Sequence, residues 1–114
     1  MIIKEMVERF GMEVKGGAGG LGRQIDTGYS GDLLSEIMGN APENCVWLTV
    51  QSHLNIVAVA VLKEMAGIVL TSGQAPDQET VEKADAEGIP LLMYNGSAFA
   101  LAGELYKAGI VSAL

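Results

Sequence analysis

The chain has 114 residues, a length that suits one domain with a hydrophobic core of its own. Apolar residues make up 49% of it, which excludes a disordered chain. The formal net charge of −7 disfavours binding to nucleic acids and to anionic membrane surfaces, because both need clustered Lys and Arg.

The first 44 residues are predicted to form short elements separated by glycines and turns. Apolar residues at helical spacing before Gly11 predict a first helix, and the glycine-rich loop further on is expected to be flexible. In chain order the predicted elements are a helix over 2–10, a brief strand over 12–15, a loop over 16–22, a half-exposed strand over 23–29, a helical segment capped by Asp32 and reaching Met38, and a turn over 41–44.

The segment from Cys45 to Gly73 contains the longest apolar stretch and is predicted to form a strand, a helix and a second strand. Val46–Val50 is rich in β-branched and aromatic residues, which suits a buried strand. Ser52 is a suitable cap for the helix, and Gly67 ends it before a second buried strand over Ile68–Leu70. A unit of this length is a right-handed βαβ crossover with parallel strands.

The helix of this unit is apolar on nearly every side. Its predicted core-facing stripe consists of Leu54, Val57, Ala58, Val61, Leu62 and Met65. Ile56, Val59 and Ala60 lie off that stripe. Such a helix must be covered on more than one side, either by the rest of the chain or by a second copy. We therefore expect a homodimer, with coverage by the chain itself as the alternative.

The remaining residues continue the alternation of helices and strands. The predicted elements are a loop over 74–77, a polar surface helix over 80–87, a buried strand over 90–94, a turn over 95–97 and a last helix from Ala98. Strands that alternate with helices predict an α/β fold: a single domain over residues 1–114 with a mostly parallel β-sheet flanked by helices.

Neither a membrane span nor a signal peptide is predicted. The longest uncharged apolar block, Ile56–Leu62, is far too short to cross a bilayer. Charged residues, among them Lys4 and Arg9, interrupt the first apolar residues, which is atypical of a signal peptide. We expect a cytoplasmic protein.

The glycine-rich loop satisfies the pattern G-x-G-x-x-G over Gly17–Gly22. In a dinucleotide-binding fold those glycines lead directly into a helix whose N-terminus holds the pyrophosphate. Here the loop leads into the predicted strand over 23–29, so the required context is missing and we interpret the loop as a connection between strands.

Metal and cofactor chemistry is limited by the residue count. The chain has one cysteine, Cys45, and one histidine, His53, whereas an iron–sulfur cluster needs about four such ligands. We predict no metal and no cofactor, with a metal shared by two subunits through these two residues as an alternative. An enzyme that uses His53 with Asp32 or Asn55 is a further alternative; the sequence supplies no obvious acid–base pair or nucleophile, so we predict no enzyme.

Polar residues gather where the three predicted parallel strands end. Ligands of open α/β sheets bind at that edge, near free N–H groups. The residues that we predict to bind a small ligand are Thr49, Gln51, Ser52, His53, Asn55, Thr71, Ser72 and Gly73, and Tyr94–Ser97 follows the third strand. The alternative is that these residues only form the turns and caps that strand ends need.

The chain resembles the DRTGG domain family across residues 1 to 110. The resemblance rests on an extended pattern, made up of Arg23, Thr27-Gly28-Tyr29, Asp32–Ser35, Asn40-Ala41-Pro42, Thr49–Ala60, Thr71-Ser72-Gly73 and the segment Asp77–Pro90.

The resemblance implies a fold like the N-terminal domain of HPr kinase/phosphorylase. The family also occurs in some phosphotransacetylases and beside CBS domains in regulated pyrophosphatases, where it is a regulatory and dimerising part without catalytic residues. Stand-alone versions are similar to proteins found beside iron-only hydrogenases. The leading hypothesis is thus a non-catalytic regulatory module that homodimerises and senses a small ligand, for example a nucleotide or an anion. The alternative is an accessory or assembly partner of a larger redox complex, such as an iron-only hydrogenase, with no ligand or cluster of its own.

Overall fold

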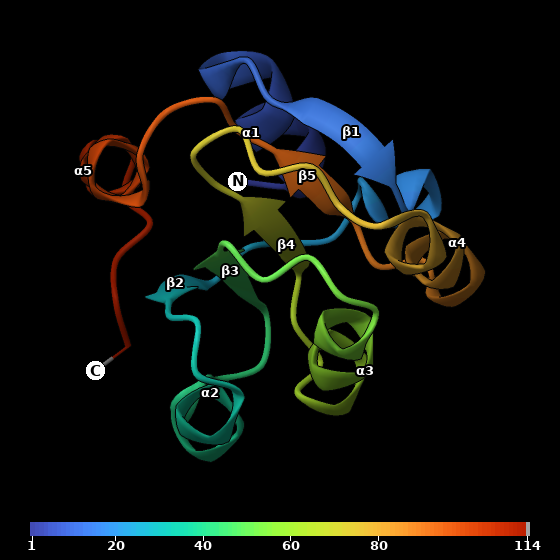
Figure 1. The fold of residues 1–114 in the computed structure, drawn as a ribbon. Helices are drawn as coiled ribbons and strands as arrows, with labels where there is room; N and C mark the ends of the chain where they lie inside the picture. Colours follow the sequence, from blue (N-terminus) through green and yellow to red (C-terminus); the bar gives the residue numbers. More distant parts are fainter. Residues whose placement is uncertain (114) are drawn as a thin grey trace.

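A five-stranded sheet forms the centre of the molecule, and helices cover both of its faces (Figure 1). The computed structural model describes residues 1–113. The strands are β1 (Glu13–Gly16), β2 (Thr27–Ser30), β3 (Cys45–Thr49), β4 (Gly67–Leu70) and β5 (Leu91–Met93). The helices are α1 (Ile3–Phe10), the 3₁₀ turn η1 (Ala18–Gly20), α2 (Leu34–Asn40), α3 (Asn55–Leu62), α4 (Gln78–Glu87) and α5 (Ala98–Lys107).

The strand order is β1-β5-β4-β3-β2. Strands β2 to β5 are parallel, and β1 is antiparallel to β5 at one edge. The predicted single α/β domain with a mostly parallel sheet is confirmed, and so is the central βαβ unit of β3, α3 and β4. The strand expected over 23–29 is shorter than predicted: β2 starts only at Thr27, and Gln24 makes an isolated bridge to Ile2.

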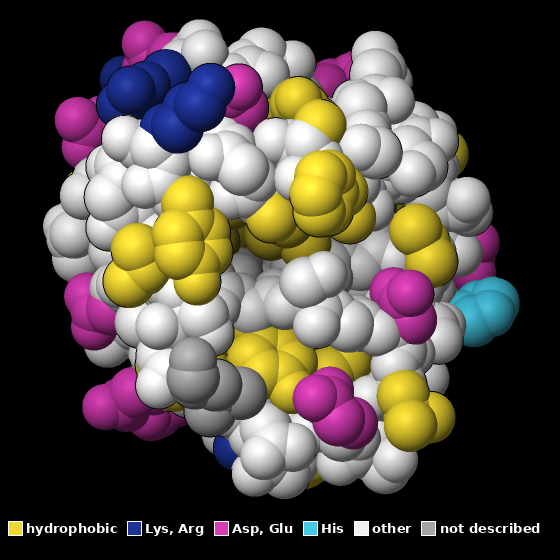
Figure 2. Space-filling view, turned by 90° about the vertical axis from the view of Figure 1, so that its left-hand side faces the viewer, with side chains coloured by type: hydrophobic (Ala, Val, Ile, Leu, Met, Phe, Trp, Pro, Cys, Tyr) yellow, Lys and Arg dark blue, Asp and Glu magenta, His cyan; other side chains and the backbone are white. Residues whose placement is uncertain are grey.

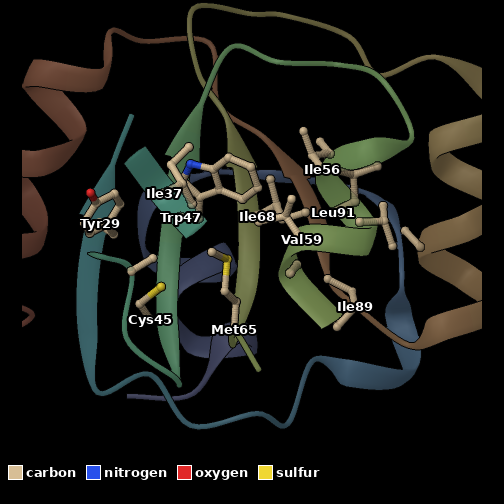
Figure 3. Close-up of a cluster of buried hydrophobic side chains, with 14 of the residues drawn as sticks. Tyr29, Ile37, Cys45, Trp47, Ile56, Val59, Met65, Ile68, Ile89 and Leu91 are labelled. Carbon is tan, nitrogen blue, oxygen red and sulfur yellow. The ribbon is translucent and has the colours of Figure 1, made fainter. Parts of the chain in front are cut away.

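A hydrophobic layer lies between the sheet and the helices on each face of the sheet. The side chains of β3 point alternately to the two faces, so this strand contributes to both layers. Trp47 belongs to the layer under α2, α3 and α4, together with Ile37 and Ile56 (Figure 3). Leu48 belongs to the opposite layer, under α1 and α5. All of β3 and β4 is buried, which explains their continuous apolar sequences.

The structure corrects the predicted core face of α3. Ile56, Val57, Val59 and Ala60 face the core, although three of these were placed off the stripe. Leu54, Val61 and Leu62 were predicted to be buried and are 44%, 41% and 67% exposed, respectively, and Ala58 is exposed with them. The helix therefore packs on α2, α4 and the sheet through one side and shows a second apolar side to solvent.

Two predicted caps are wrong. Leu54 precedes α3 and Leu33 precedes α2, and neither helix start has a side-chain cap. Ser52 lies too early in the chain to cap α3, and the Asp32 side chain bonds to the end of β3 instead. At α5, by contrast, the Ser97 hydroxyl accepts a hydrogen bond from the Ala100 N–H at 3.1 Å.

The glycine-rich loop is packed against the chain and does not behave as a loose connection. Gly17 donates its N–H to the Asp85 carboxylate at 2.7 Å, and a Cβ there would lie 1.8 Å from the Ile89 carbonyl oxygen. A Cβ on Gly20 would lie 2.3 Å from the carbonyl oxygen of Gly88. These glycines are needed because the loop backbone touches the backbone before β5.

Candidate functional site

The three turns that follow β3, β4 and β5 meet at one edge of the sheet, as predicted. The Thr71 N–H donates to the Thr49 carbonyl at 3.1 Å. Beyond it, the Ser72 and Gly73 N–H groups donate to the carbonyls of Gly96 and Tyr94, at 2.8 Å and 3.0 Å. We call this the strand-end edge.

Asp32 organises one half of the strand-end edge. One of its carboxylate oxygens accepts hydrogen bonds from the Thr49 hydroxyl at 2.8 Å and from the Val50 N–H at 3.0 Å. The Asp32 carbonyl accepts from the Gln51 side chain at 2.8 Å. Thr49 and Gln51 thus have structural partners within the chain. For Asp32 the sequence predicted a helix cap or, as an alternative, a catalytic role, and its contacts with Thr49, Val50 and Gln51 were not predicted.

Ser52 and His53 contact the start of α4 rather than the turns after β4 and β5. The Ser52 carbonyl accepts from the Thr80 hydroxyl at 2.7 Å and from the Asp77 N–H at 3.2 Å. His53 Nδ1 lies 2.9 Å from an Asp77 carboxylate oxygen, and both side chains are more than half exposed. Water screens such a pair, so the contact contributes little to stability.

Asn55 lies at the exposed start of α3. The predicted ligand set is therefore divided between the strand-end edge and the junction of α3 with α4, and its binding role stays a prediction.

The turn after β4 has an unusual polar group and backbone. Thr71 is 1% exposed, and within residues 1–113 its hydroxyl oxygen has no hydrogen-bond partner. Ser72 and Gly73 follow with φ values of 59° and 67°, in the left-handed region that a serine rarely adopts. Buried polar groups are normally paired, so the Thr71 hydroxyl marks the least satisfied point of this edge.

Cys45 is the first residue of β3 and His53 lies beyond the other end of this strand, so one subunit cannot bring them to the same metal ion. From Cys45 to the last residue of β3 the strand alone spans roughly 13 Å. Burial raises the pKa of the Cys45 thiol to about 11, which keeps it protonated at neutral pH. Among residues 1–113, no three His, Cys, Asp or Glu side chains gather as a metal site would require.

A separate cavity of about 270 Å³ lies at the β2 edge of the sheet, against α5. We call it the β2–α5 cavity. Its lining residues are Gly28, Tyr29, Ser30, Glu36, Leu48, Ala102, Leu105, Tyr106, Ile110, Val111 and Ser112. Figure 2 shows the corresponding side of the molecule, where hydrophobic side chains gather around a hollow. No pattern in the sequence indicates this cavity, because its walls come from segments that are distant in the sequence.

A tyrosine and a carboxylate form the polar corner of the β2–α5 cavity. The Tyr29 hydroxyl donates a hydrogen bond to Glu36. Burial and this carboxylate raise the pKa of Tyr29 to about 12, so the phenol stays protonated and remains a donor to Glu36.

Comparison with known proteins supports the class of fold. No family model and no curated protein matches the chain. A solved structure does: the CBS and DRTGG domains of the regulatory region of Clostridium perfringens pyrophosphatase, complexed with the activator diadenosine tetraphosphate. The TM-score is 0.66 at 12% identity, over 87% of this chain and 43% of the solved one.

The matched share fits the DRTGG domain of the solved chain, so the expected resemblance to a DRTGG domain is confirmed at the level of the fold. The present chain spans less than half of the solved chain, which is described as the regulatory region of a larger enzyme. None of the helices in residues 1–113 is long and apolar enough to cross a lipid bilayer.

Proposed function

We propose that this protein is a non-catalytic regulatory module that forms a homodimer through the outer side of α3 and responds to a small ligand. The observation that carries the proposal is the apolar stripe of Leu54, Ala58, Val61 and Leu62, which its own chain leaves open. Support for a regulatory role comes from the fold, which also occurs in the regulatory region of a pyrophosphatase.

The α3 stripe is suited to a contact between identical copies. Its residues recur at i, i+4, i+7 and i+8, so they line one side of the helix. Beside them lies a shallow hollow lined by Ala58, Val61, Leu62, Lys83 and Glu87. Lys83 and Glu87 carry opposite charges 3.3 Å apart, so a twofold axis can pair each with the opposite residue of a second copy.

The net charge of the chain opposes dimer formation, so a dimer depends on the burial of the apolar stripe. Two copies, each with a formal charge of −7, repel one another at long range. Apolar burial next to a locally balanced Lys83–Glu87 pair offsets this repulsion, and raised salt weakens the repulsion without weakening the apolar contact. Dimer formation should therefore become tighter as the salt concentration rises.

Paired substitutions test the assignment of the interface. Leu62→Glu places two carboxylates near the twofold axis and should raise the dimer dissociation constant at least about tenfold in sedimentation velocity. The control is Leu33→Glu, immediately before α2, because Leu33 is also 67% exposed. A dimer that tolerates Leu62→Glu but dissociates with Leu33→Glu, or with Phe99→Glu on α5, would refute the α3 interface.

The ligand response belongs, in this proposal, to the strand-end edge. The unpaired Thr71 hydroxyl and the left-handed backbone at Ser72 and Gly73 support it, since ligand sites often hold such groups. The matched pyrophosphatase region was complexed with a dinucleoside polyphosphate, so nucleotides are the first ligands to test. Thermal-shift screening should find a nucleotide that raises the melting temperature, and Thr71→Val should abolish the shift. No shift with any nucleotide or acyl phosphate would remove this part of the proposal.

A second candidate function is that of an assembly partner in a redox complex. A second apolar surface favours it: Phe99 and Tyr106, seven residues apart on α5, are 91% and 57% exposed. This surface would stay open in a dimer formed through α3. Mixing with a purified iron-only hydrogenase subunit should give a complex in size-exclusion chromatography that Phe99→Glu abolishes and Leu62→Glu leaves intact.

A further inference from the structure

We propose that the β2–α5 cavity binds a small organic cation, namely an ammonium group on an apolar body. This inference goes beyond the function proposed above, because the cavity lies apart from the α3 stripe and involves none of the residues predicted at the strand-end edge. Its evidence is the size of the cavity, the chemistry of its walls and the sign of its charge.

The walls of the cavity are apolar and are fixed by the core. Leu48, Leu105 and Ile110 line it and are 2%, 3% and 5% exposed, so packing on the sheet holds their side chains in place. A volume of about 270 Å³ is slightly below the usual range for ligand pockets, which suits a body the size of one aromatic ring with a short chain.

The segment after α5 closes the cavity at the sheet edge. The Gly28 N–H of β2 donates to the Val111 carbonyl at 3.1 Å, and Gly28 pairs with Ser112 in a parallel bridge. The Ser112 N–H in turn donates to the Tyr106 hydroxyl at 3.1 Å. These contacts tie the outer wall to both β2 and α5, so the cavity is built into the fold.

The charge of the cavity selects the ligand. Among residues 1–113, Glu36 is the only formally charged residue that lines it, and no Lys, Arg or His does. Within residues 1–113 no cation forms an ion pair with Glu36, whose hydrogen bond comes from the neutral Tyr29 hydroxyl. A carboxylate keeps further acceptor positions when one hydrogen bond is made, so it can take an ammonium donor as well.

The aromatic residues of the cavity favour the same ligand. Tyr29 and Tyr106 both line it, and a tyrosine ring attracts a cation placed over its face. The net charge of −7 raises the local concentration of cations around the whole chain. A carboxylate-bearing ligand of equal size would meet Glu36, and the described lining holds no basic residue that would offset the repulsion.

Three probes of similar size test the inference: 2-phenylethylamine, which is a cation at pH 7, neutral 2-phenylethanol and anionic phenylacetate. Binding to the full chain is followed by NMR chemical-shift titration. The amine should bind most tightly, the alcohol more weakly and the anion most weakly, with shifts at Leu48, Leu105 and Ile110.

Substitutions then separate the charge of the site from its volume. Glu36→Gln should weaken the amine about tenfold and leave the alcohol unchanged; Glu79→Gln on α4 is the control for net charge. Ala102→Leu should fill the cavity and abolish binding of the amine and the alcohol, whereas Ala100→Leu, at an exposed position of α5, should not.

The proposal is overturned if phenylacetate binds as tightly as the amine, if Glu36→Gln leaves amine binding unchanged, or if none of the probes shifts cavity residues at millimolar concentration. A failure of Ala102→Leu to fold would leave the Glu36→Gln result to decide. Neither the oligomeric state nor the nucleotide response enters these outcomes, so the cavity and the proposed function fail separately.

Discussion

Tyr29 connects the chemistry of one residue to the pH dependence of the whole protein. Its folded-state pKa is raised to about 12 by burial and by Glu36, above the ordinary value of 10. The unfolded chain therefore loses the phenol proton first, and the free energy of unfolding falls as the pH rises from about 10 to about 12. Below pH 10 this contribution is fully present.

The ionisation of the Tyr29 phenol can be followed by ultraviolet absorbance as the pH is raised. The chain has three tyrosines, so the signal contains three ionisation steps. We expect a late ionisation step near pH 12 from Tyr29, and this step should vanish in Tyr29→Phe. In Glu36→Gln the late step should move toward pH 10, since the carboxylate that opposes the phenolate is gone. A late step that persists in Tyr29→Phe would show that the assignment is wrong.

Substitution of Thr71 is expected to raise the free energy of unfolding, whereas most substitutions in a protein core lower it. Its hydroxyl is buried without a partner, which costs free energy, whereas valine has the same shape and no hydroxyl. Thr71→Val should raise the free energy of unfolding by about 1 kcal/mol in urea denaturation followed by Trp47 fluorescence. Thr49→Val, which removes a hydroxyl bonded to Asp32, is the control and should lower it. A lowered stability in both variants would mean that the Thr71 hydroxyl is satisfied in solution.

The sequence predicted which polar residues follow the strands but not what each one contacts. Polar turn residues follow three apolar segments that were predicted to be parallel strands. Because the carboxyl ends of parallel strands lie at the same edge of a sheet, Thr49, Thr71 and their neighbours were predicted to lie together. The central role of Asp32 depended on β2 lying beside β3, a non-local pairing that spacing along the chain does not encode. The Tyr29–Glu36 corner, by contrast, joins two residues only seven apart in the sequence, from β2 and α2.

At the scale of elements, α3 shows a limit of predicting the buried side of a helix from hydrophobic periodicity. Two apolar stripes run along this helix, and hydrophobic spacing cannot decide which one faces the sheet when both are apolar. The stripe with Leu54 and Leu62 was predicted to face the core, and the structure buries Ile56 and Val59 instead. The more general expectation, that an all-round apolar helix needs cover on two sides, stays a prediction, because the outer side of α3 is exposed in the single chain.

The glycine-rich loop provides an element-scale test of close packing. Gly17 has a φ of +70° and no room for a Cβ, whereas no heavy atom lies within 4 Å of a Cβ on Gly19. Gly17→Ala should lower the free energy of unfolding by more than about 2 kcal/mol, and Gly19→Ala should change it by less than about 0.5 kcal/mol. Equal effects in thermal or urea denaturation would mean that the loop is not packed as described.

At the scale of the molecule, local sequence patterns predicted the fold class and the βαβ unit. They did not predict which strands lie at the two edges of the sheet. Alternation of elements gave a mostly parallel sheet, yet nothing in it placed β1 antiparallel beside β5 or β2 at the far edge. The β2–α5 cavity exists because of that edge position. Predicting it would have required the strand order.

The central claim is that the outer side of α3 is covered by a second copy of the chain, and the solution molar mass tests it most directly. Light scattering during size-exclusion chromatography, over a concentration series at two salt concentrations, should give twice the 11.9 kDa chain mass at micromolar concentration. The dimer fraction should rise with salt. A mass of 11.9 kDa throughout the series would contradict the account, because the α3 stripe would then be stable in water without a partner.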